Sequence, residues 1–245
     1  YGTSYGSYIA AGLGVRHPSR VHAMILDSPV LSGRDIDIVR QTMRAVLWHG
    51  ENPETTELAG KMRRLAADGV MSPAAAQVAS GLYGLGGASL LNRQLDLLLA
   101  GRRLVWTVLD RAGRRLVHRK TPYRNEADLV GRIGYRELNY ADPPDGLPLD
   151  PAVAMREFAD GEIPPFEAEP FDLVAQMPTF SWPTVVVSGG RDLITLPPVA
   201  DRIASLVPGA VLVRLPTTGH SALDTKEAAA LRIAAAVTAG RSGTL

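Results

Sequence analysis

The chain has 245 residues, of which 46% are hydrophobic and 21% charged, as in an ordinary globular enzyme that has one large domain or a domain with an insertion. Its formal net charge of +1 gives no reason to expect a nucleic acid or a membrane surface as a partner. The lack of cysteine excludes disulfides and thiolate metal sites, and no apolar stretch approaches the roughly 18 residues that a membrane helix needs.

The first part of the chain predicts an α/β architecture. Residues 5–17 are rich in small and apolar residues and end at Pro18, a pattern typical of a helix that packs closely on a sheet. Residues 21–27 form a short apolar run, which predicts a buried parallel strand. A strand, a sharp turn, a helix and a second strand together indicate a doubly wound sheet.

A mostly helical insertion is expected over residues 34–178. From residue 35 to residue 99 the apolar positions recur at helical spacing, with a break at Gly84–Gly87. Residues 101–140 are amphipathic and rich in arginine. Residues 142–170 hold many prolines and predict a long loop with one short helix.

The α/β pattern returns in residues 179–245. Residues 184–188 are mostly β-branched and predict a central strand, which is followed by a helix at about 198–206. Residues 210–215 predict the next strand, and residues 224–239 an alanine-rich terminal helix. The expected division is therefore a core formed by 1–33 and 179–245, with an insertion at 34–178.

The run Gly2-Thr3-Ser4-Tyr5-Gly6 suits a sharp turn from a strand into a helix, with the serine as a nucleophile. We expect a Cβ at Gly2 or Gly6 to crowd this turn. The helix N-terminus would direct amides towards developing negative charge, with the N–H of Tyr5 as one oxyanion-hole donor. Taken alone, the pattern also fits a glycine-rich turn beside a helix.

A catalytic serine needs a histidine to accept its proton, and the histidine needs an acid to orient it. Asp192 follows the predicted strand 184–188 across a Gly-Gly turn, and His220 follows the predicted strand 210–215. Both therefore lie at carboxyl ends of parallel strands, where such sheets place their sites. The order serine, acid, histidine predicts a triad of Ser4, Asp192 and His220.

Other chemistry is less well supported by the sequence. Asp27 also ends a predicted strand and is the alternative acid, although a structural role in the turn Asp27-Ser28-Pro29 is the more ordinary interpretation. No pair of histidines has metal-ligand spacing, and no glycine-rich run follows a strand as a phosphate cradle would. We therefore expect no metal, nucleotide or other cofactor.

Four segments carry a resemblance to a known family: YGTSYGSYIA, HPSRVHAMILDSPV, SGGRDLITLPPVADRIASLVPGA and TTGHSALDT. They resemble the prolyl and tripeptidyl aminopeptidase-like branch of the α/β-hydrolases. The resemblance implies a serine hydrolase in which Ser4, Asp192 and His220 are the nucleophile, the acid and the base. It also implies that the helical insertion forms a cap that governs substrate access.

Two further expectations follow from the resemblance. The chain would be the C-terminal part of a doubly wound α/β-hydrolase sheet, an N-terminally truncated fragment whose first strands and second oxyanion donor lie upstream. Such aminopeptidases hold the substrate's α-ammonium with carboxylates of the cap, and Glu137 and Asp142 are the candidates. For each of these acids, a solvated or salt-bridged side chain is the alternative.

The resulting leading hypothesis is acyl transfer to water through an acyl-serine, with the release of N-terminal residues from short peptides. A carboxylesterase acting on small esters is the alternative within enzymes, and a non-catalytic binding protein that keeps the fold is the alternative outside them. The expected partner is a small peptide or ester. The sequence leaves the oligomeric state and the cellular location open.

Overall fold

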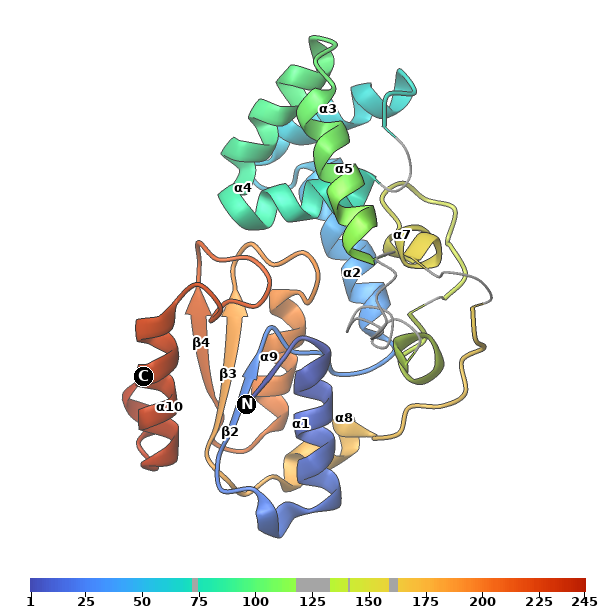
Figure 1. Cartoon of the computed structure of the whole chain (residues 1–245). Helices are drawn as coiled ribbons and strands as arrows, with labels where there is room; N and C mark the ends of the chain where they lie inside the picture. The colour runs from blue at the N-terminus through green and yellow to red at the C-terminus, as the bar shows by residue number, and fades with distance from the viewer. Residues whose placement is uncertain (72–74, 118–132, 141, 159–162) are drawn as a thin grey trace. The chain divides into compact units, whose positions relative to one another are not determined.

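A computed structural model of the chain describes residues 1–71, 75–117, 133–140, 142–158 and 163–245. The chain divides into two compact units, which are described separately (Figure 1). Unit 1 consists of Tyr1–Asp35 and Glu169–Leu245, and unit 2 consists of Ile36–Ala168. The expected insertion at 34–178 therefore begins slightly before unit 2 and extends beyond its end.

Unit 1 is built on a four-stranded parallel sheet with the order β1-β2-β3-β4. Its strands are β1 (Gly2–Thr3), β2 (Met24–Asp27), β3 (Thr184–Gly189) and β4 (Val211–Leu215). Every residue of β3 is buried, as its β-branched composition predicts for a central strand. The strands expected from the apolar runs are confirmed, although the first of them is shorter than its run.

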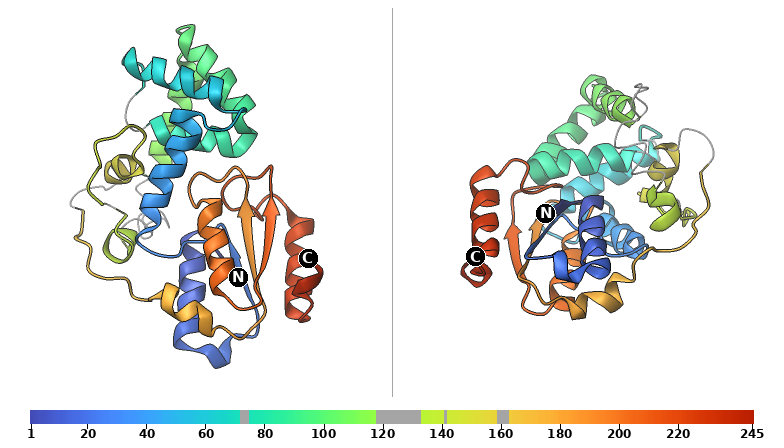
Figure 2. Two further views of the ribbon diagram at one scale, coloured as in Figure 1. Left: turned by 180° about the vertical axis from the view of Figure 1, so that it is seen from behind. Right: turned by 60° about the horizontal axis from the view of Figure 1, so that its bottom comes forward.

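Helices cover both faces of this sheet. Helix α10 (Glu227–Thr238) packs on one face, in a cluster that includes Val185 and Val187 of β3. Helices α1 (Tyr5–Arg16) and α9 (Pro197–Leu206) lie on the other face (Figures 1 and 2). A parallel sheet between two helical layers confirms the predicted α/β class.

The segment that begins at Glu169 belongs to unit 1 because it packs on α1. A Cβ on Gly12 would lie 2.2 Å from the ring of Phe171, so the glycine makes room for this ring. The hydroxyl of Tyr8 donates to the carbonyl oxygen of Phe171 at 3.1 Å. Residues 169–178, expected in the insertion, are therefore part of the core. This segment contains α8 (Leu173–Gln176) and leads into a 3-10 turn (Met177–Thr179); two further 3-10 turns of unit 1 are Pro18–Arg20 and Ser242–Thr244.

The described residues of unit 2 are mostly helical, as predicted for the insertion. Its elements are α2 (Asp35–Arg44), a π-helical turn (Ala45–His49), α3 (Thr56–Ala67), α4 (Ala75–Leu99), α5 (Leu104–Val117) and α7 (Pro151–Phe158). The break expected at Gly84–Gly87 is a kink within α4, where Gly87 has a φ of 67°. Within the described residues of both units, no helix is long and apolar enough to span a bilayer.

Candidate active site

Ser4 forms the turn between β1 and α1. Its backbone has φ 52° and ψ −130°, a conformation that residues other than glycine seldom adopt. Its N–H donates to the carbonyl oxygen of Asp27 on the neighbouring strand at 3.0 Å. Ser4 is the N-cap residue of α1, yet its hydroxyl makes no capping hydrogen bond, although serine commonly caps in this way. The Ser4 hydroxyl is therefore not engaged in capping helix α1.

The two glycines around this serine have different roles. A Cβ on Gly2 would lie 2.3 Å from the carbonyl oxygen of Gly6, which is closer than any real contact allows. A Cβ on Gly6 would meet no heavy atom of the described residues within 4 Å, because this exposed position faces away from the turn. The predicted crowding is confirmed for Gly2 and is wrong for Gly6.

Tyr5 is the first residue of α1, so its N–H is one of the amides at the helix N-terminus. Its side chain is buried, and its ring stacks on that of Tyr8 with 6.2 Å between the centroids. This packing fixes the backbone directly after Ser4. The role of the Tyr5 N–H as an oxyanion-hole donor stays a prediction.

Asp192 lies just past the end of β3 and is 1% exposed. Its Oδ1 accepts the N–H of Ile194 at 2.8 Å and the N–H of Thr195 at 3.0 Å. These two backbone donors hold one carboxylate oxygen in place. Because the Asp192 side chain is already held in one orientation, a contact of its other oxygen, Oδ2, with a side-chain partner costs little further conformational entropy.

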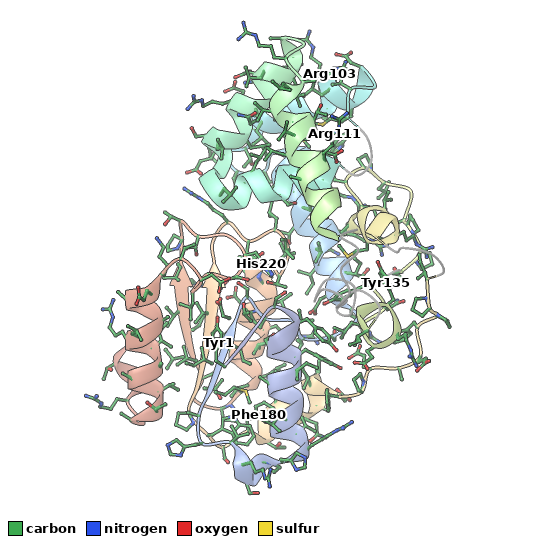
Figure 3. The ribbon with its side chains drawn as sticks, in the orientation of Figure 1. Tyr1, Arg103, Arg111, Tyr135, Phe180 and His220 are labelled. Atoms are coloured by element: carbon green, nitrogen blue, oxygen red, sulfur yellow. The ribbon has the colours of Figure 1, made fainter. Side chains whose placement is uncertain are left out.

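His220 lies in the loop after β4, beyond the carboxyl end of the strands (Figure 3). Its Nδ1 is 3.1 Å from Oδ2 of Asp192, so the structure brings these two predicted site residues into direct contact. The hydroxyl of Thr195 donates to the same Oδ2 at 2.9 Å and lies 3.1 Å from His220 Nδ1. We did not predict Thr195 from the sequence. The spacing Asp-x-x-Thr, which permits side chain-to-backbone turns, is the signal that could have identified it.

Gly189 allows two loops to approach each other: the loop after β3, which carries Asp192 (the acid loop), and the loop after β4, which carries His220 (the histidine loop). A Cβ on Gly189 would lie 2.2 Å from the carbonyl oxygen of Gly219. The N–H of Arg191 donates to the carbonyl oxygen of Thr218 at 2.9 Å. Backbone contact between the two loops thus brings the carboxylate within reach of the imidazole.

The turn that carries Ser4 (the nucleophile turn) contacts the histidine loop through the residues next to Ser4 and His220. Oγ1 of Thr3 lies 3.4 Å from Oγ of Ser221, the residues just before Ser4 and just after His220. Among the described residues, no hydrogen bond joins the Ser4 hydroxyl to the His220 ring. Such bonds are often long in unliganded enzymes and shorten when the substrate binds.

Asp27, the alternative acid, faces the backbone of the histidine loop and not the imidazole. Its Oδ1 accepts the N–H of Ala222 at 3.1 Å and its Oδ2 the N–H of Leu223 at 3.0 Å. Burial raises the pKa of Asp27 above its ordinary value, and the hydrogen bond from Leu223 opposes this rise. Asp192 is therefore the carboxylate in contact with His220.

The predicted substrate-binding acids, Glu137 and Asp142, lie in unit 2. Oδ2 of Asp142 accepts a hydrogen bond from Arg40 Nη1 at 2.8 Å, and its Oδ1 accepts one from Asn139 Nδ2 at 2.9 Å. The charge of Asp142 is thus balanced within unit 2, which favours the salt-bridged alternative for this residue. Glu137 is half-buried at the end of the helical residues 133–137.

A buried ion pair of unit 2 lies beside a mostly apolar cavity. Nε of Arg40 is 3.1 Å from Oδ1 of Asp150, and the two residues are 8% and 2% exposed. The cavity has a volume of about 300 Å³, and Trp48, Leu147 and Asp150 are among its lining residues.

Nowhere in the described ranges do three histidine or acidic side chains form a group that could hold a metal ion.

Comparison with known proteins gives one sequence match and several solved structures of low sequence identity. No family model matches the chain. A stretch of 77 residues, 31% of the chain, is 36% identical to the polyketide synthase ThaQ of Burkholderia thailandensis and covers 3% of that protein.

Three solved structures illustrate the structural similarity. A proline iminopeptidase from Mycobacterium smegmatis has 17% sequence identity and a TM-score of 0.49, over 99% of this chain and 65% of that one. Est816, an enzyme that degrades N-acyl homoserine lactones, has 17% identity and a TM-score of 0.41, over 96% and 64%. The enol-lactonase from Burkholderia xenovorans LB400 has 17% identity and a TM-score of 0.40, over 98% and 64%. The chain thus spans slightly less than two thirds of the length of each.

Proposed function

We propose that the chain carries the catalytic residues of a serine hydrolase of the α/β-hydrolase type, with Ser4 as nucleophile, His220 as base and Asp192 as the orienting acid. The observation that carries this proposal is the 3.1 Å contact between His220 Nδ1 and Asp192 Oδ2. Both residues follow strands of the parallel sheet that also positions Ser4. Parallel sheets commonly hold their active sites at this carboxyl edge.

The first half of the reaction forms an acyl-enzyme. The Ser4 oxygen attacks the substrate carbonyl carbon while His220 Nε2 takes the hydroxyl proton. Asp192 accepts a hydrogen bond from the Nδ1–H of His220 and stabilises the imidazolium that forms. The Tyr5 N–H donates to the oxyanion. When the tetrahedral intermediate collapses, the carbon–nitrogen or carbon–oxygen bond breaks and the imidazolium returns its proton to the leaving group.

The second half of the reaction releases the acyl group to water. His220 takes a proton from a water molecule, whose oxygen attacks the acyl carbon of the Ser4 ester. Collapse of the second intermediate breaks the bond between the acyl carbon and the Ser4 oxygen, and the proton returns to that oxygen. The free enzyme is restored with one water consumed and no cofactor required.

For the substrate, we propose the amide at the N-terminus of a short peptide. The support is the resemblance of the segments around Ser4, Asp192 and His220 to the prolyl and tripeptidyl aminopeptidase-like branch. In this proposal unit 2 is the cap that governs access, and Glu137 and Asp142 are the candidates for binding the substrate's ammonium group. Small esters undergo the same acyl-serine chemistry and are the second substrate class to test.

The test uses the native protein that carries this chain. Aminoacyl and tripeptidyl arylamides are assayed beside p-nitrophenyl esters, and Ser4→Ala is compared with Ser205→Ala, which changes an exposed serine of α9. We expect arylamide turnover that Ser4→Ala abolishes and Ser205→Ala leaves unchanged. Activity that survives Ser4→Ala would overturn the mechanism, and ester turnover without arylamide turnover would overturn the peptidase assignment. Substrate binding without any turnover would favour a non-catalytic binding protein.

A further inference from the structure

A single residue, Asp27 at the end of β2, contacts both the nucleophile turn and the histidine loop. Its carbonyl oxygen accepts the N–H of Ser4 at 3.0 Å. Its carboxylate accepts the N–H groups of Ala222 at 3.1 Å and Leu223 at 3.0 Å, the second and third residues after His220. The backbones that carry the proposed nucleophile and base are therefore hydrogen-bonded to the same residue.

The Asp27 carboxylate is 0% exposed and receives two further hydrogen bonds. The Tyr1 hydroxyl donates to Oδ2 at 3.1 Å, and the Ser28 hydroxyl donates to Oδ1 at 3.3 Å. Burial and the neighbouring Asp27 raise the pKa of Tyr1 to about 12, so its phenol keeps the proton that it donates. Each carboxylate oxygen thus has one backbone donor and one hydroxyl donor. Only a carboxylate offers two acceptor oxygens in this arrangement, because an amide would place an N–H₂ group against one of the donors.

The residues next to Asp27 and His220 extend this contact. The N–H of Ser221 donates to the hydroxyl of Ser28 at 2.9 Å. Both serines have positive φ values, 54° for Ser221 and 48° for Ser28. Backbone conformations of this kind cost energy and persist only where the surroundings hold them, and they are concentrated at functional sites. The histidine loop is therefore held in a strained shape by the end of β2.

We propose that Asp27 is a positioning residue, which sets the place of His220 relative to Ser4 by holding the backbone of both. This inference rests on the proposed function, because it assigns a task within that reaction. Its physical reason is that acylation requires the base and the nucleophile at near-attack distance, and a displacement of about 1 Å can cost about 100-fold in rate. Within the described residues, the Asp27 carboxylate contacts the backbone after His220 and not the imidazole, so it acts through the backbone.

The test compares Asp27→Asn with Asp224→Asn in the native protein that carries this chain. Asp224 is an exposed acid four residues after His220, so the control makes the same chemical change in the same loop. Active sites are first titrated with a fluorophosphonate, so that only reactive enzyme is counted. We expect Asp27→Asn to lower kcat per titrated site about 100-fold, with KM changed less than about threefold. The control should keep the native kcat.

A spectroscopic readout separates positioning from a loss of folded protein. The proton between His220 Nδ1 and Asp192 should give a downfield proton resonance in the native enzyme and in Asp224→Asn. In Asp27→Asn this signal should shift or broaden, because the loop that carries the imidazole has lost its anchor. A native resonance together with a native kcat per titrated site would overturn the proposal.

Two further variants keep the outcome decisive. If Asp27→Asn does not fold, Ser28→Ala takes its place, since it keeps the Asp27 carboxylate. It removes the hydroxyl that accepts the Ser221 N–H and donates a longer hydrogen bond to Asp27 Oδ1. Its expected loss in kcat is about tenfold, the rate equivalent of one hydrogen bond, and an unchanged kcat would then overturn the proposal. Ser4→Ala identifies the other failure: an active Ser4→Ala rejects the proposed function itself. An inactive Ser4→Ala beside a fully active Asp27→Asn rejects only the role of Asp27.

Discussion

The hydroxyl of Thr195 lies 3.1 Å from Nδ1 of His220 and donates to the carboxylate that the same nitrogen contacts. The Nδ1 proton can therefore be shared between Asp192 and Thr195. We expect Thr195→Val, which keeps the side-chain shape, to lower kcat about tenfold through the loss of one hydrogen bond. Thr195→Ser keeps the hydroxyl and should retain most of the activity. A Thr195→Val variant with a kcat as high as that of Thr195→Ser would show that the hydroxyl does not support the reaction.

The acid at position 192 should be far more sensitive than the hydroxyl beside it. In Asp192→Asn, an amide N–H₂ group can face His220 Nδ1 and favour the tautomer that cannot accept the serine proton. We expect kcat to fall roughly 10⁴-fold, with KM little changed. Asp201→Asn is the matched control, because this acid lies on the exposed side of α9 and pairs only with the exposed Arg214 among the described residues. A small effect of Asp192→Asn would point back to another acid.

The two glycines of the nucleophile turn should respond in opposite directions to alanine. Gly2→Ala places a Cβ 2.3 Å from the backbone of Gly6, so we expect the free energy of unfolding to fall by about 1–3 kcal/mol. Gly6→Ala adds a methyl group to an open position of α1 and should raise it by about 0.5–1 kcal/mol. Urea unfolding of the two variants measures both changes. A destabilising Gly6→Ala would restore the original expectation that both glycines are crowded.

Asp35, at the start of α2, should make stability depend on pH. Its Oδ2 accepts the N–H groups of Leu31 and Ser32, while its buried Oδ1 has no hydrogen-bond partner among the described residues. Burial raises the pKa of Asp35 from 3.8 to about 6, and the two backbone hydrogen bonds oppose this rise. The folded protein thus holds this proton more tightly than the unfolded chain does. The contribution of Asp35 to the free energy of unfolding therefore falls as pH rises from about 4 to about 6.

Replacement of this acid should remove that dependence. In Asp35→Asn the free energy of unfolding, measured by urea titration across the same pH range, should lose the decrease that the carboxyl causes. Asp37→Asn serves as the control, since its side chain is 67% exposed. If Asp35→Asn and the native protein show the same slope, the titrating group lies elsewhere.

The buried arginine of unit 2 should matter more for stability than for chemistry. Arg40→Met leaves the 2% exposed carboxylate of Asp150 without its closest cation, so we expect a loss of about 3–5 kcal/mol in the free energy of unfolding. The double variant Arg40→Met with Asp150→Leu should recover part of this loss, because both charges are then gone. Urea unfolding of the two variants decides this, and a stable Arg40→Met would show that water reaches Asp150.

The sequence was informative wherever the signal is local. The β-branched run at 184–188 and the spacing of small residues in 5–17 are set by neighbours in the chain, and both elements form as predicted. The contact between Asp192 and His220 could be anticipated too, because residues that follow neighbouring parallel strands meet at the same sheet edge.

What could not be predicted depends on contacts between distant parts of the chain. The packing of Phe171 against Gly12 moves residues 169–178 into the core, and no local pattern marks it. Asp27 is an ordinary strand-end acid in the sequence, and its hydrogen bonds to Ala222 and Leu223 join residues 195 and 196 positions apart. Burial of that carboxylate and the shape of the loop around it are properties of the folded sheet alone.

The construction of unit 1 from two separated segments bears on how the protein can change over evolution. The sheet forms only when two segments come together that the whole of unit 2 separates in the sequence, Tyr1–Asp35 and Glu169–Leu245. The entropic cost of closing such a loop grows only with the logarithm of its length, by about 0.6 kcal/mol for each doubling. Insertions or deletions between Asp35 and Glu169 therefore change the free energy of folding only slightly. The sheet that carries Ser4, Asp192 and His220 can then be inherited unchanged while unit 2 changes in length.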